Sequence, residues 1–235
     1  LGPLVLNGTR FLPSLDGKRW ENSSEEANDG LEQTIQIEIK RSRLRVEILK
    51  SDSDVTAKFE LFQRLNTGGA ALTEQEVRNS ITVALNREFY DWLIALSQFP
   101  PFITTTRQTD TALESQEGVE LALRFFAFRN IAYRNGLDVH EYLDDALLQL
   151  AQSDDFDSAA EGDVFKRTFS LLNNALGAQA FQKWDGQAFK GKFLMSLYEV
   201  IATGASKNID AIEAMGADAH AFIVDRSKKL WADEQ

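Results

Sequence analysis

The sequence contains no cysteine, and this absence excludes disulfide bonds and thiolate metal sites. Histidine is scarce too, because His140 and His220 are the only two in the chain. A zinc site built from several histidines is therefore not expected. Neither histidine lies in a nucleophile motif, which argues against Ser/His/Asp catalysis. We assign no residue as a metal ligand.

Long apolar runs and excess positive charge are also missing. No segment approaches the roughly 18 consecutive apolar residues that a membrane helix requires, so no membrane contact is expected. The net charge is −11, from 25 Lys and Arg against 36 Asp and Glu. A protein this acidic does not bind DNA with its whole surface, so any contact needs a local basic patch or another part of the protein. The absence of cysteine is compatible with a cytoplasmic location.

The chain has 235 residues, 43% of them hydrophobic, with 16 phenylalanines. This is enough to bury a core, either as one large domain or as two small ones. The first residues, Leu1-Gly2-Pro3-Leu4, include no initiator methionine, no basic segment and no long apolar segment. They do not form a signal peptide, and we expect further sequence upstream of them.

Hydrophobic periodicity divides the chain into two zones, and we predict a mainly α (α+β) fold. Residues 1–80 carry the strand signals, the best being Leu44–Leu49, while helix and strand patterns compete over 23–39. We place a domain boundary after residue 84 and a helical bundle over 85–235. The helices are expected at about 74–85, 87–97, 112–134, 138–151, 157–177, 187–203 and 207–232, with a loop over 98–111.

The stretch from Phe59 to Asn79 reads as a helix, a glycine turn and a second helix. The turn is Asn66-Thr67-Gly68-Gly69, and Thr73 with Glu76 forms a capping box for the second helix. Backbone N–H groups at such a helix start make an anion site. Arg64 and Asn66 supply a guanidinium and an amide beside it. The alternative is a plain connector, since no lysine follows the glycines as in a phosphate-binding loop.

The pattern Phe-x-Arg-Leu-Asn-Thr-Gly-Gly, then Leu-Thr-x-x-Glu-x-Arg-Asn, resembles the signature of domain-of-unknown-function family 262. That family includes the GmrS half of the GmrSD modification-dependent restriction enzymes. The upstream segment from Leu12 to Trp20 also resembles the family. The matching residues of the signature are Phe62, Arg64, Leu65, Asn66, Thr67, Gly68, Gly69, Leu72, Thr73, Glu76, Arg78 and Asn79.

The resemblance implies a ParB/sulfiredoxin-like fold and a role in prokaryotic anti-phage defence. Residues 1–84 would then be the C-terminal part of a ParB-like nucleotide or nuclease domain. The family's hallmark is an Asp-Gly-Gln-Gln-Arg motif, tied to nucleotide hydrolysis or DNA cleavage, which normally lies upstream. It is absent here, and Asp16-Gly17-Lys18-Arg19 reads as an ordinary turn. Activity with Mg²⁺ and a nucleoside triphosphate is therefore expected only when an N-terminal part supplies that motif.

Residue roles follow from the resemblance and from the anion-site reasoning together. Arg64 and Asn66 would face the phosphate, and Glu76 would bind a metal or water, or else serve only the capping box. The remaining phosphate-binding candidates are Thr67, Gly68, Gly69, Arg78 and Asn79.

Nucleic-acid contact is expected at the basic run that includes Lys40, Arg41 and Arg43. The alternative there is a solvated edge without a ligand. The alternative function for the whole chain is a non-catalytic helical module that docks onto another defence subunit.

Other chemistry-bearing residues have plainer interpretations. Arg124 and Arg129 are expected at the edge of the core in ion pairs, and His220 in packing. Trp184 can stack a base or pack, and packing is the commoner role. The acids Asp144, Asp145, Asp154, Asp155 and Asp157 are interpreted as helix N-terminal acids and solvated charge.

Overall fold

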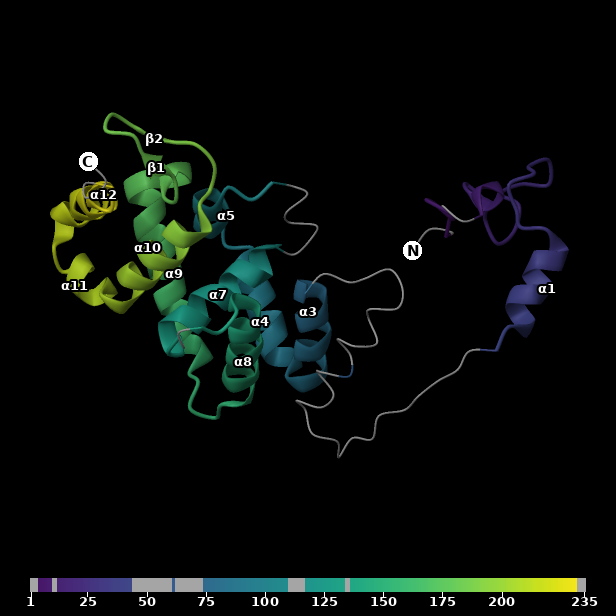
Figure 1. The fold of residues 1–235 in the computed structure, drawn as a ribbon, viewed down its shortest axis with the longest axis horizontal. Helices are drawn as coiled ribbons and strands as arrows, with labels where there is room; N and C mark the ends of the chain where they lie inside the picture. The colour runs from purple at the N-terminus through teal and green to yellow at the C-terminus, as the bar shows by residue number, and fades with distance from the viewer. Residues whose placement is uncertain are drawn as a thin grey trace. The chain divides into compact units, whose positions relative to one another are not determined.

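The computed structural model describes residues 4–9, 12–43, 61, 74–109, 117–133 and 136–231. The chain divides into two compact units, Leu1–Asp52 and Ser53–Gln235 (Figure 1). The predicted strand over 44–49 and the glycine turn over 66–69 lie outside the described residues. The boundary after residue 84 stays a prediction, although the helix that ends there packs on two helices of the second unit.

In the described residues of the first unit, loops connect a 3-10 turn, η1 (Pro13–Leu15), to an α-helix, α1 (Gln33–Arg41). The helical reading of the ambiguous stretch over 23–39 therefore holds for its second half. Arg19 forms isolated bridges to Val5 and to Gly30. Gly30 is required by packing, because a Cβ there would lie 2.7 Å from the Asn22 backbone nitrogen. Asn22 Oδ1 instead accepts a hydrogen bond from the Gly30 N–H at 2.7 Å.

The second unit is mainly helical, as the sequence predicted. Its shorter elements are the 3-10 turns η3 (Gly177–Gln179) and η4 (Gly216–Asp218), and the antiparallel strands β1 (Lys183–Trp184) and β2 (Phe189–Lys190). Its α-helices are α3 (Glu74–Leu85), α4 (Arg87–Ser97), α5 (Pro100–Thr106), α7 (Glu117–Asn130), α8 (Val139–Gln152), α9 (Ser158–Leu176), α10 (Met195–Lys207), α11 (Ile209–Glu213) and α12 (Ala219–Lys229).

Helix α7 lies in the middle of the second unit and contacts α4, α8 and α10 (Figure 1). Its phenylalanines Phe125 and Phe126 are buried, as expected for a helix that is apolar on more than one side. They pack against Phe165 of α9, whose ring centroid lies 5.2 Å and 5.6 Å from theirs. Edge-to-face and offset ring pairs of this kind stabilise a core beyond the area they bury.

Two predictions about secondary structure are wrong. Residues 98–111 were expected as a loop, but Pro100 and Pro101 begin α5. Proline is favoured in the first turn because its missing N–H is not needed there and its φ already suits a helix. The strand signals were placed within residues 1–80, yet the two-stranded hairpin of the described residues lies at 183–190, and α10 begins only at Met195.

The predicted last helix over 207–232 is interrupted in the structure. It consists of α11, η4 and α12, with Gly216 at φ +59° between them. Left-handed backbone of this kind favours glycine and ends a helix. Across the described ranges, no helix combines the length and the hydropathy that a bilayer crossing needs.

Candidate functional site

Helix α3 carries the part of the signature that the structure describes. Glu76, Arg78 and Asn79 lie on it, and Glu76 is exposed while Arg78 and Asn79 are buried. The other signature candidates, Arg64, Asn66, Thr67, Gly68 and Gly69, lie outside the described residues. Their predicted roles therefore stay predictions.

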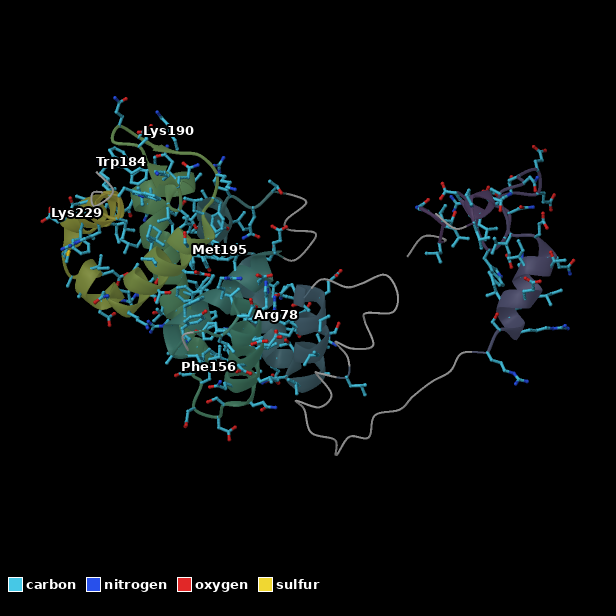
Figure 2. All side chains as sticks on the ribbon, in the orientation of Figure 1. Arg78, Phe156, Trp184, Lys190, Met195 and Lys229 are labelled. Carbon is cyan, nitrogen blue, oxygen red and sulfur yellow. The ribbon has the colours of Figure 1, made fainter. Side chains whose placement is uncertain are left out.

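Arg78 is the most buried charged side chain of the described residues, with 1% of its surface exposed (Figure 2). Its Nη1 donates to Asp144 Oδ1 of α8 at 3.1 Å, and its Nη2 lies 3.5 Å from Glu120 Oε2 of α7. Its Nε donates to Gln75 Oε1 at 3.1 Å, and Gln75 Nε2 donates to Asn79 Oδ1 at 2.7 Å. Arg78 thus ties α3 to two other helices.

The contacts of Arg78 continue into an ion-pair chain that reaches α10. Glu120 also accepts from Arg124 Nη2 at 3.0 Å, and Arg124 Nη1 donates to Glu199 Oε1 at 2.5 Å. We call Arg78, Glu120, Arg124, Asp144 and Glu199 the Arg78 network. It holds two cations and three carboxylates, so it has no excess positive charge with which to attract a phosphate. Its geometry fits anchoring of the helices.

A buried tyrosine lies beside the Arg124 end of the Arg78 network. Tyr198 of α10 is fully buried, and its hydroxyl donates to the Leu121 carbonyl oxygen. Burial raises the pKa of Tyr198 well above its usual value, and the Glu199 carboxylate adds to the rise while Arg124 opposes it. The hydroxyl therefore stays protonated as a donor. Ion pairs in such a setting are sensitive to the loss of one partner.

Sequence reasoning placed several residues of this region correctly and missed others. Arg124 was expected in an ion pair at the edge of the core, and so was Arg129, whose Nε donates to Glu161 Oε2 at 2.9 Å. Both predictions are confirmed. Asp144 was interpreted as a helix-start or solvated acid, which is wrong, because it is partly buried against Arg78.

The predicted basic run lies at the end of α1 in the first unit. Lys40, Arg41 and Arg43 are all exposed. The Lys40 ammonium lies 5.4 Å from the centre of the Trp20 ring, and Lys40 and Arg41 stand in the last turn, where the helix dipole favours cations. Exposure and a place in the last turn suit a solvated edge as well as a nucleic-acid contact, so the nucleic-acid contact stays a prediction.

An apolar groove of about 430 Å³ lies between α10, α11 and α12. Val200, Met215 and Leu230 line it and are exposed at 56%, 41% and 45%. Arg226 and Lys229 also line it. Exposed apolar side chains gathered in one groove are typical of an interaction surface.

Two further predictions have an outcome in the second unit. Trp184 packs against Phe189, with ring centroids 4.9 Å apart, so the packing interpretation has support. His220 was expected in packing but is exposed on α12, so that prediction is wrong.

In the part of the chain that the structure describes, no three His, Asp or Glu side chains are grouped as a metal site. Comparison with protein families, curated proteins and solved structures found no match to this chain.

Proposed function

We propose that this chain is part of a prokaryotic anti-phage restriction protein and contributes half of a nucleotide-hydrolysing or DNA-cleaving phosphodiester site. The Arg64-Leu65-Asn66-Thr67-Gly68-Gly69 signature motivates the proposal. The observation that carries it further is the anchoring of α3, whose first residue, Glu74, follows the glycine turn closely in the sequence. Arg78 fixes this helix to α7 and α8. A binding turn needs a rigid support of this kind, because sites must be held to within a fraction of an ångström.

The proposal gives the signature residues two kinds of role. Arg64, Asn66 and the glycine amides would contact the phosphate, and exposed Glu76 would hold Mg²⁺ or water. Arg78 is a positioning residue, because its guanidinium already has carboxylate partners. Asn79, within hydrogen-bond distance of Gln75, supports the same helix.

Replacing Arg64 or Asn66 with alanine is expected to weaken binding of a magnesium–nucleoside triphosphate complex. Each hydrogen bond to a charged group contributes about 1.5–3 kcal/mol, so the dissociation constant should rise roughly tenfold to a hundredfold. Isothermal titration calorimetry on the purified chain measures this. Arg87→Ala is the matched control, because Arg87 is 76% exposed and pairs only with its neighbour Asp91 within the described contacts. Equal affinities for Arg64→Ala, Asn66→Ala and Arg87→Ala would rule out the site.

A second candidate function, docking onto another defence subunit, is favoured by the apolar groove between α10, α11 and α12. Its apolar side chains suit one face of an amphipathic helix. Arg226 and Lys229 add positive charge to the same groove, so the partner helix should carry carboxylates beside its apolar face. We therefore infer an acidic amphipathic helix as the occupant.

Replacing Val200 with aspartate is expected to abolish binding of a designed acidic amphipathic peptide to the groove. The substitution puts a carboxylate into the apolar lining, where it also repels the peptide's acids. Val83→Asp is the control, because Val83 is also exposed, at 38%, but lies on α3. Fluorescence anisotropy of the labelled peptide gives the result. The groove is not the docking site if the wild-type chain does not bind the peptide, or if the Val200→Asp and Val83→Asp variants bind it equally.

A further inference from the structure

The β1–β2 hairpin gathers lysines on one of its faces. Lys183 and Lys190 are directly opposite each other in the antiparallel pair. Like charges placed directly opposite each other in a sheet repel. Lys190 Nζ lies 2.7 Å from Asp185 Oδ2, which offsets part of this repulsion.

Helix α12 brings a further lysine and a second indole to the hairpin. The Lys228 ammonium lies 4.4 Å from the centre of the Trp184 ring, and the Lys183 ammonium lies 4.8 Å from that of Trp231. Figure 2 shows Trp184 and Lys190 at one end of the helical unit, with Lys229 of α12 beside them. Each of the two indole rings therefore has a lysine ammonium group over it.

Arg107 adds a cation from the end of α5. Its Nη1 donates to the Gly191 carbonyl oxygen at 2.9 Å, next to exposed Lys192. Arg107 has φ +55°, the only positive φ among the described residues other than glycine. This conformation is unfavourable for a side chain with a Cβ. The position nonetheless carries an arginine whose charged end meets the hairpin.

Two carboxylates near these cations are held in their charged form, mainly by specific hydrogen bonds. A hydrogen bond from Lys190, followed by the Ala188 and Gln187 amides, holds the pKa of Asp185 well below its usual range. The pKa of Asp225 is also lowered, first by its hydrogen bond with Lys229 and then by the charges of Lys229, Arg226 and Lys228. The whole chain carries a net charge of −11, so attraction of a phosphate requires a local group of cations such as this one.

We propose that these side chains bind the phosphodiester backbone of a nucleic acid. We call Arg107, Lys183, Lys190, Lys192 and Lys228 the basic hairpin surface. The inference rests on the proposed restriction function and deepens it by naming the surface that holds the DNA strand. It lies in the second unit, apart in sequence from the predicted basic run at Lys40–Arg43.

The side-chain mixture favours nucleic acid over the other polyanions. Lysine ammonium groups suit the phosphates of a backbone, and Trp184 and Trp231 put aromatic rings beside them, a combination that surfaces for single-stranded nucleic acid use. A membrane surface needs large apolar side chains that insert beside the cations. Among the described residues, no exposed large hydrophobic side chain lies between 183 and 192, although Leu230 near Lys228 is 45% exposed, and the vesicle competition below tests the membrane alternative.

The double variant Lys183→Gln/Lys192→Gln tests the proposal on the whole chain. Binding of a short labelled DNA strand, single or double, is followed by fluorescence anisotropy while the salt concentration is raised. We expect the dissociation constant for DNA to rise roughly tenfold or more. The slope of the logarithm of the binding constant against the logarithm of the salt concentration should become shallower by about two, or about one for each lysine removed. Lys166→Gln/Lys207→Gln removes the same charge from exposed positions on α9 and α10 and should bind as the wild type does.

The other outcomes would overturn the proposal. The first is a wild-type chain that does not bind DNA, and the second is an equal effect of the two double variants. The third is competition by polyglutamate or by phosphatidylserine vesicles that is as strong as competition by unlabelled DNA. Circular dichroism checks that each variant is folded. The Lys183→Gln/Lys192→Gln variant separates this inference from the proposed function, because its affinity for a magnesium–nucleoside triphosphate complex should stay at the wild-type level while its affinity for DNA falls. If Asn66→Ala loses nucleotide binding but the Lys183→Gln/Lys192→Gln variant binds DNA as the wild type does, the proposed function stands and the proposed DNA-binding surface is wrong.

Discussion

Replacing Arg78 with alanine is expected to lower the free energy of unfolding by about 3–5 kcal/mol, the usual effect of removing one partner from a buried ion pair. The Arg78 side chain is 1% exposed. Its loss leaves Asp144 of α8 and Glu120 of α7 without that cation, at side-chain exposures of only 16% and 23%. It also removes the donor to Gln75 on α3 itself.

Urea denaturation followed by circular dichroism measures this loss. Arg87→Ala is the control and should cost less than about 1 kcal/mol, because Arg87 and Asp91 form an exposed i,i+4 pair. The Asp144→Asn variant combined with Arg78→Ala should be less destabilised than the sum of the two single variants, since the isolated charge is gone. Additive losses, or an Arg78→Ala effect no larger than the control, would contradict the anchoring role of Arg78.

Replacing Phe165 with alanine is also expected to lower the free energy of unfolding by about 3–5 kcal/mol, which is typical of Phe→Ala in a core. Phe165 is fully buried. Its ring centroid lies 4.5 Å from that of Phe169, 5.0 Å from that of Phe102 and 5.2 Å from that of Phe125. The lost ring leaves a cavity that α5, α7 and α9 border.

Phe165→Leu is the matched variant, because it keeps most of the apolar volume and should cost clearly less than Phe165→Ala. Thermal and urea unfolding of both variants give the comparison. Similar losses for leucine and alanine would show that the site is not a filled core. At temperatures where both variants remain folded, DNA binding at the basic hairpin surface should be unchanged, because Lys183 and Lys192 are exposed.

Local patterns in the sequence predicted most helices of the second unit. The apolar spacing gave α4, α8 and α9 to within a few residues. Asp157 was interpreted as a helix-start acid, and it caps α9 by accepting from the Ala159 and Ala160 amides at 3.0 Å. Such signals lie within one turn of the helix that they define, so they can be read without knowledge of the fold.

Features that depend on distant partners were not predictable in this way. Proline is a stop signal inside a helix and a start signal in its first turn, so Pro100 and Pro101 were assigned to a loop although they begin α5. The hairpin was missed because its strands are only two residues long, which leaves no alternation to detect.

The candidate sites were predictable only in part, for the same reason. Arg78 was assigned to phosphate, but the chain positions of its partners, Glu120 and Asp144, are 42 and 66 residues away. No local pattern connects them. The residues of the basic hairpin surface come from the end of α5, from the hairpin and the residues after it, and from α12. From the sequence alone, only Trp184, which lies beside this surface, was considered.

The amide resonances of Gly68 and Gly69 give the most direct test of the phosphate site at the signature turn. Nuclear magnetic resonance on the isotope-labelled chain would record them while magnesium and a nucleoside triphosphate are added. We expect both resonances to shift and saturate, because their N–H groups would donate to the phosphate, and we expect the Asn66→Ala variant to need roughly tenfold more nucleotide or higher for the same shift. Resonances that stay in place, or that shift at the same nucleotide concentration in the variant, would contradict phosphate binding at this turn.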